Sequence, residues 1–120
     1  MDKLLDTMNV LLGENGCPWD KEQTHESMRE NLIEECNEVI EAINKKDFSE
    51  LKEELGDVLL QVVFHAKIAE KAGHFNIHDV IETITEKLIR RHSHIFGEDK
   101  AINAEDALKI WEKNKEKERL

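Results

Sequence analysis

The feature that most constrains the fold of this chain is the helical spacing of its apolar residues. Leucine, isoleucine, valine and methionine recur every three or four residues through most of the sequence, which is the period of one face of an α-helix. The strict alternation of a half-buried strand is not seen. The content of five glycines, one proline and no tyrosine also argues against an all-β fold with many turns. We therefore expect an all-α fold.

The apolar pattern predicts a bundle of about four to five helices in a single domain spanning residues 1–120. We find no internal repeat and no linker that would divide the chain. Residues 14–24 are expected to form the only long irregular stretch. The first three expected helices cover residues 4–12, 28–45 and 48–72. A fourth follows Asn76 and carries apolar residues up to Ile89, before Gly97 breaks the chain, and a fifth follows Asn103 and runs through Trp111 into the charged tail.

Capping residues mark several of the expected helix ends. Asp47, Asn76 and Asn103 each precede an apolar helical stripe and are suitable N-caps. Gly73 follows the third helix, where glycine readily takes the left-handed conformation that ends a helix. Because the second and third helices are long and joined by a short link, we expect them to pack antiparallel.

The charge balance limits the classes of partner. The chain has 17 basic and 27 acidic residues, for a formal net charge of −10, which argues against binding polymeric nucleic acid through a basic surface. A phosphate ligand remains possible because metal ions can invert the local charge. The sequence shows no secretory signal and no apolar run long enough to span a membrane, so a cytoplasmic location is expected.

Acidic side chains occur in pairs on the two long helices. Glu34 is followed by Glu35 and Glu38, and the next helix carries Glu54 and Asp57. Residues three apart on a helix are neighbours on its surface. If the helices pack antiparallel, the Glu35–Glu38 pair and the Glu54–Asp57 pair can face each other.

Four clustered carboxylates must protonate, separate or bind cations. Two like charges about 4 Å apart repel by roughly 4 kcal/mol at an effective dielectric of 20. An all-oxygen ligand set favours Mg²⁺, with Mn²⁺ as a possible substitute, and Mg²⁺ commonly shares its shell with substrate phosphates. The alternative is that these acids simply belong to solvated helix faces, as many of the 27 must.

One further pair holds two cations, and another holds a cation and an aromatic ring. Lys87 and Arg91 lie one helical turn apart, as do Trp111 and Lys115. Lysine and arginine bind phosphate oxygens, and tryptophan offers a face for stacking a base. A solvated basic turn and a tryptophan that docks the last helix are equally simple interpretations.

Four segments of the chain carry distinctive motifs. The first reads Cys-Pro-Trp-Asp-Lys-Glu-Gln-Thr-His-Glu-Ser-Met from residue 17. The acidic motifs at 34–39 and 53–66 follow, and the last segment is Glu-Lys-Leu-Ile-Arg-Arg-His-Ser-His-Ile-Phe-Gly over 86–97. Together they resemble the MazG-type nucleoside triphosphate pyrophosphohydrolase family, and the resemblance covers about residues 17 to 115. The chain departs from many relatives at Glu30-Asn31 and Cys36-Asn37, where aromatic residues are common.

The resemblance implies an all-α MazG-like bundle that works as a homodimer or homotetramer. It also implies hydrolysis of nucleoside triphosphates, with ribose or deoxyribose, to the monophosphate and pyrophosphate in the presence of Mg²⁺. The metal ligands implied are Glu35, Glu38, Glu54 and Asp57. The substrate-binding residues implied are Trp19, Gln23, His25, Lys87, Arg91, Trp111 and Lys115.

The expected mechanism is attack of water at the α-phosphorus, with Glu34 or Glu38 as the catalytic carboxylate that takes the proton. Two other functions remain open at this point. One is a pyrophosphatase restricted to a single deoxynucleotide such as dUTP or dCTP. The other is a non-catalytic helical partner module that has kept the scaffold.

Overall fold

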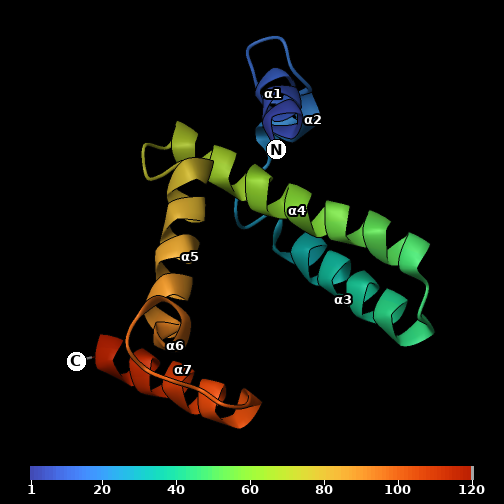
Figure 1. Ribbon diagram of the computed structural model, residues 1–120. Helices are drawn as coiled ribbons and strands as arrows, with labels where there is room; N and C mark the ends of the chain where they lie inside the picture. Colours follow the sequence, from blue (N-terminus) through green and yellow to red (C-terminus); the bar gives the residue numbers. More distant parts are fainter. Residues whose placement is uncertain (120) are drawn as a thin grey trace. The chain divides into compact units, whose positions relative to one another are not determined.

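The computed structural model describes residues 1–119, and this part of the chain folds into seven helices without a strand (Figure 1). The all-α prediction is therefore confirmed. The chain divides into two compact units, one covering Met1–Ile77 and one beginning at His78. Each unit is described by itself.

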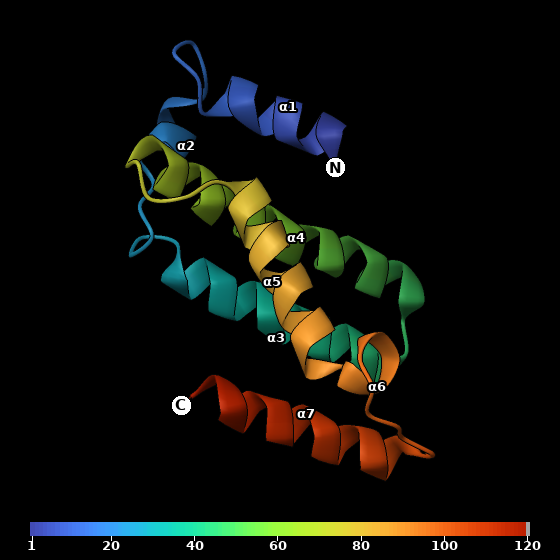
Figure 2. The same ribbon diagram turned by 60° about the vertical axis from the view of Figure 1, so that its left-hand side comes forward.

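The first unit is built on an antiparallel pair of long helices, α3 (Arg29–Lys45) and α4 (Phe48–Lys71). The two helices lie side by side along their length (Figures 1 and 2). Lys46 takes a left-handed conformation with φ 55°, and the Asp47 side chain accepts a hydrogen bond from the Glu50 backbone N–H at 3.0 Å. The tight link reverses the chain, as the sequence predicts.

Two further helices complete the first unit. Helix α1 (Asp2–Leu11) packs on α4, and the Lys71 ammonium donates a hydrogen bond to the Leu12 carbonyl. Gly73 follows α4 with φ +81°, so its predicted role in ending the helix is confirmed. The buried apolar side chains of this unit are Met8, Leu12, Met28, Ala42, Val63, Phe64, Ala66, Ala69 and Ile77.

The prediction of irregular structure throughout residues 14–24 was wrong for residues 18–22. A short helix, α2 (Pro18–Glu22), lies within this stretch. Pro18 occupies its first turn, where the fixed φ of proline suits a helix and its missing N–H costs nothing. A five-residue helix has too few apolar positions to show a helical period, so the pattern did not reveal it.

The second unit contains α5 (Ile77–Arg91) from His78 onward, α6 (Ser93–Phe96) and α7 (Ala104–Glu118). The four-residue helix α6, which packs on α7, was not predicted either. The Asn103 side chain accepts a hydrogen bond from the Asp106 backbone N–H at 2.9 Å, as expected of an N-cap. The Asn114 amide donates to Ser93, whose hydroxyl donates to Asp99, so a polar chain links α6 to α7.

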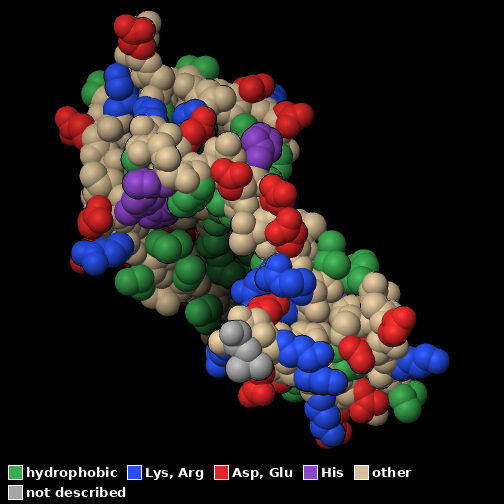
Figure 3. Space-filling view, turned by 90° about the vertical axis from the view of Figure 1, so that its left-hand side faces the viewer, with side chains coloured by type: hydrophobic (Ala, Val, Ile, Leu, Met, Phe, Trp, Pro, Cys, Tyr) green, Lys and Arg blue, Asp and Glu red, His purple; other side chains and the backbone are tan. Residues whose placement is uncertain are grey.

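Part of the apolar stripe on each long helix lies open to solvent. On α3, Ile33 and Ile40 are 60% and 55% exposed, and on α4, Leu55 and Val62 are 50% and 40% exposed. Apolar side chains are also visible on the face shown in Figure 3. Within the described residues, no helix is both long and apolar enough to cross a membrane.

Candidate metal centre

Four carboxylates converge where α3 and α4 pack together. Glu35 and Glu38 come from α3, and Glu54 and Asp57 come from α4. One oxygen of each side chain lies within 4.8 Å of one oxygen of every other. The spacing of three residues within each pair places both acids on one helix face, and the short link brings the two faces together. Glu34 is exposed and is not part of this group.

Two oxygens of this group are buried without a hydrogen-bond partner. They are Oε2 of Glu35 and Oε2 of Glu54. An unsatisfied buried acceptor is costly, and for a charged group the cost is larger. A cation bound among the carboxylates would satisfy both oxygens.

The pKa values of two carboxylates in the cluster are raised. The pKa of Glu54 is raised to about 7, first by a hydrogen bond with Glu38 and then by burial and by the neighbouring acids. The pKa of Glu35 is also raised, mainly by burial and next by the charge of Glu38. Without a cation, Glu35 and Glu54 therefore keep their protons to a higher pH than ordinary glutamates do.

The donor set fits a hard divalent cation. All four groups offer carboxylate oxygens, and neither histidine nor cysteine belongs to the cluster. Oxygen ligands of this type favour Mg²⁺ or Mn²⁺ over softer metals. Cation binding would also relieve the like-charge repulsion that raises the pKa of Glu54.

The early segment of the expected substrate site forms its own hydrogen-bonded turn. Trp19 on α2 is 58% exposed, and its carbonyl accepts a hydrogen bond from the Gln23 amide at 2.9 Å. The Gln23 side-chain oxygen accepts from the Ser27 hydroxyl at 2.8 Å. Gln23 is thus a fixed part of this turn, and the indole of Trp19 is open to solvent.

His25 is tied to a residue that we interpreted from the sequence as a packing residue. Its Nδ1 lies 2.8 Å from Nδ1 of His65 on α4, and the two rings are stacked. The Nε2 atom of His65 is buried without a partner. No sequence spacing links positions 25 and 65, so the pattern could not reveal this pair.

The second unit contains the expected phosphate-side residues. Lys87 and Arg91 are both half-buried on α5, and Trp111 and Lys115 are half-buried on α7. The Arg91 guanidinium carbon lies 5.1 Å from the centre of the Trp111 ring. The structure thus brings one residue of each pair into direct contact.

The sequence analysis did not identify the carboxylate that binds Arg91. Glu118, near the end of α7, binds both Arg90 and Arg91 through its carboxylate. The two arginines precede Glu118 by 27 and 28 positions. The only signal available was a glutamate in a charged helix end, which is common in solvated helices.

Comparison with known proteins shows the family to which the chain belongs. The family model for the MazG nucleotide pyrophosphohydrolase domain matches residues 23–96, which include all four clustered carboxylates. The chain belongs to the MazG nucleotide pyrophosphohydrolase domain family. This finding confirms the resemblance inferred from the sequence motifs.

Two relatives are similar in sequence to nearly the whole of this chain. A nucleoside triphosphate pyrophosphohydrolase/pyrophosphatase MazG of Thermotoga maritima is 52% identical over 97% of this chain and 46% of its own length. A nucleoside triphosphate pyrophosphohydrolase of Escherichia coli is 46% identical over 99% of this chain and also 46% of its own length. The chain therefore spans about half the length of these relatives.

A solved structure shares the fold. The crystal structure of a mazG-related protein from Thermotoga maritima matches with a TM-score of 0.80 and 32% sequence identity. The match covers 97% of this chain and 99% of that one. The all-α fold of this chain is therefore one that a family relative also adopts.

Proposed function

We propose that this protein is a nucleoside triphosphate pyrophosphohydrolase that acts on ribo- or deoxynucleotides with Mg²⁺, or Mn²⁺ as a substitute. The observation that carries the proposal is the meeting of four carboxylates from α3 and α4. The two relatives described above are named for this activity over the same region. The alternative of a non-catalytic module would give no reason to keep four mutually repelling acids together.

In this proposal, Glu35, Glu38, Glu54 and Asp57 hold the cation. When bound, the cation would neutralise phosphate charge and make water a better nucleophile at neutral pH. The carboxylates need no large movement, because their oxygens already lie within 4.8 Å of one another. The buried oxygens of Glu35 and Glu54 are the donors that gain most, since they have no other partner.

The chemical step is hydrolysis at the α-phosphorus. A water oxygen forms a bond to this phosphorus, and the bond to the oxygen bridging the α- and β-phosphates breaks. The bridging oxygen keeps the electron pair and leaves on pyrophosphate. The water proton passes to a carboxylate: Glu34 is proposed as the acceptor, since it lies beside the cluster and contributes to the raised pKa of Glu35, with Glu38 as the other candidate.

The remaining residues are proposed to bind the substrate. Lys87 and Arg91 would offset charge on the phosphates, and Trp111 and Lys115 would assist them from α7. On the first unit, exposed Trp19 offers a stacking face, and Gln23 and His25 border it on the same turn. These assignments rest on the family motif and, for Trp19, also on the exposure of its side chain.

We also propose that the protein works as a homodimer or homotetramer through the α3–α4 pair. By 100° per residue, Phe48, Leu55, Leu59 and Val62 lie within about 60° of one another around α4. All four are exposed by 40% or more. A contiguous apolar face of this kind on a soluble helix pair is typical of a protein interface.

The activity is tested by pyrophosphate release from a panel of triphosphates that includes ATP, dUTP and dCTP. We expect release with Mg²⁺, none in the presence of EDTA, and a loss of at least about 100-fold for Glu38→Gln. The matched control is Glu53→Gln, an exposed acid on α4 outside the cluster, which should retain activity. Hydrolysis of dUTP or dCTP alone would support the single-nucleotide alternative, and no hydrolysis of any triphosphate would support the non-catalytic one.

A further inference from the structure

We propose that Glu118 is a positioning residue that holds the Arg91 guanidinium against α7, so that Arg91, Trp111 and Lys115 form one phosphate-binding group. This inference rests on the proposed function, in which these residues bind substrate phosphates. It adds to the site a residue of the opposite charge that does not itself touch the substrate.

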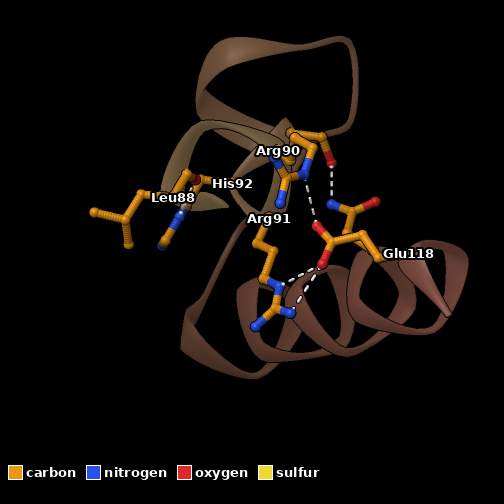
Figure 4. Close-up of polar contacts among 7 residues, drawn as sticks. Leu88, Arg90, Arg91, His92 and Glu118 are labelled. Atoms are coloured by element: carbon orange, nitrogen blue, oxygen red, sulfur yellow. Dashed lines mark hydrogen bonds and ion pairs between the residues drawn. The ribbon is translucent and has the colours of Figure 1, made fainter. Parts of the chain in front are cut away.

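Glu118 on α7 binds Arg90 and Arg91 at the end of α5, and we call this set of contacts the Glu118 clamp. Arg91 donates from Nε and Nη2 to Oε2 of Glu118 at 3.1 and 2.9 Å. Arg90 donates from Nε to the other oxygen, Oε1, at 3.0 Å. Figure 4 shows both arginine side chains pointing at this carboxylate. Each oxygen of Glu118 is thus bonded to a different arginine.

Arg91 is held on a second side by Trp111. Its guanidinium carbon lies 5.1 Å from the centre of the indole ring, within the range of a cation–π contact. The His92 ring packs edge-on against the same indole, with centroids 5.1 Å apart. The guanidinium therefore has one orientation, set by the carboxylate and by the ring.

The spacing on α7 explains why the clamp organises the group. Trp111, Lys115 and Glu118 lie within about 60° of one another by 100° per residue. Fixing Glu118 to Arg91 therefore turns the face that carries Trp111 and Lys115 toward α5. The side chain of Arg91 is only 13% exposed, against 53% for Arg90, so the clamp is strongest on the residue proposed to bind phosphate.

The clamp leaves positive charge for the substrate. Two guanidinium groups share one carboxylate, so one positive charge remains unbalanced. An arginine has five N–H donors, and Glu118 takes two from Arg91. Phosphate oxygens bind to such donors in the same way that a carboxylate does.

The decisive experiment compares steady-state hydrolysis by the wild type, Glu118→Ala and Glu118→Asp. We expect Glu118→Ala to raise the KM for triphosphate by roughly three- to tenfold, with kcat changed by less than about twofold. Glu118→Asp should recover part of the loss. Glu116→Ala, an exposed glutamate two positions earlier, is the matched control and should behave as wild type.

A second readout does not depend on turnover. In a Trp19→Phe background, Trp111 is the only tryptophan, and its fluorescence reports contact with Arg91. We expect Glu118→Ala to change this emission and to weaken binding of inorganic pyrophosphate by a similar factor. If Glu118→Ala unfolds, Glu118→Gln removes the charge and keeps the volume.

An unchanged or lower KM in Glu118→Ala, with unchanged Trp111 emission, would overturn the proposal. A lower KM would mean that Glu118 competes with phosphate for Arg91. If the wild type hydrolyses no triphosphate, the proposed function fails. The fluorescence and pyrophosphate measurements would then still decide whether Glu118 organises an anion site.

Discussion

His25 and His65 form a hydrogen-bonded pair, with their Nδ1 atoms 2.8 Å apart and their rings stacked at 5.1 Å and nearly parallel. One ring must donate and the other accept, so at least one of the two must be neutral. The pKa of His65 is lowered, first by burial and then by the charge of His25. The pair joins the segment that carries Gln23 to α4.

Acidification should therefore loosen this segment. Because the pKa of His65 is lower in the folded chain, the unfolded chain binds protons more readily, and the stability from the pair is lost as pH falls below the ordinary histidine value of about 6.5. We expect the melting temperature of the wild type to fall between about pH 7.5 and 5.5, relative to His65→Phe. Thermal melts of both proteins in metal-free buffer provide the test.

The comparison with His65→Phe is needed because Glu54 titrates in the same range with the opposite sign. Its raised pKa favours the folded chain at low pH, and this contribution is common to both proteins. His74→Phe, which changes an exposed histidine, should keep the wild-type profile. Equal profiles for wild type and His65→Phe would show that the pair does not stabilise the fold.

Cation binding should release a proton near neutral pH. Glu54, with a pKa of about 7 in the cation-free protein, must be ionised to serve as a ligand. We expect the apparent affinity for Mg²⁺ or Mn²⁺ to rise about tenfold between about pH 6 and pH 8. Calorimetric titration in two buffers of different ionisation enthalpy measures both the affinity and the proton.

The same site should also respond to removal of the cation. We expect EDTA to lower the melting temperature at pH 8, since binding to the folded state alone stabilises it. Glu54→Gln should bind the cation more weakly and lose most of the pH dependence. A cation affinity independent of pH in the wild type would contradict the assignment of Glu54 as a protonated ligand.

Removing the N-cap of α4 should destabilise the first unit. The Asp47 carboxylate accepts the Glu50 N–H at 3.0 Å. Asp47→Ala should reduce the free energy of unfolding by about 1 kcal/mol. Asp47→Asn keeps an acceptor, so its free energy of unfolding should stay close to that of the wild type. Urea denaturation measures both. Equal losses for the two variants would mean that the cap is not the source of the effect.

The exposed apolar faces of α3 and α4 should carry the oligomer contact. Ile40 and Leu59 are 55% and 40% exposed, and a buried aspartate at either position would be unpaired in an interface. We expect Ile40→Asp or Leu59→Asp to shift the protein to a monomer in light scattering coupled to size-exclusion chromatography. Ile102→Asp, at a 93% exposed position of the second unit, should leave the mass unchanged.

Helix ends and the acid spacing were well predicted because they depend on local sequence. Asp47, Gly73 and Asn103 cap the helices as expected, since a cap needs only its own neighbours. The meeting of Glu35 and Glu54 followed from two helical faces and a short link. Their roles as metal ligands remain a proposal.

Long-range pairs were beyond the reach of the sequence. His25 with His65 and Arg91 with Glu118 join residues far apart in the chain, and neither position has a spacing that points to its partner. Short helices were missed for a different reason. In α2 and α6, one turn offers too few positions to establish a period.

The two-residue link between α3 and α4 has a consequence for assembly. All four clustered acids fall within residues 35–57, so bringing them together closes only a small loop of chain and costs little entropy. Proteins rich in such local contacts fold faster than those that depend on distant pairings. The acid cluster therefore needs no residue from outside the α3–α4 hairpin to assemble.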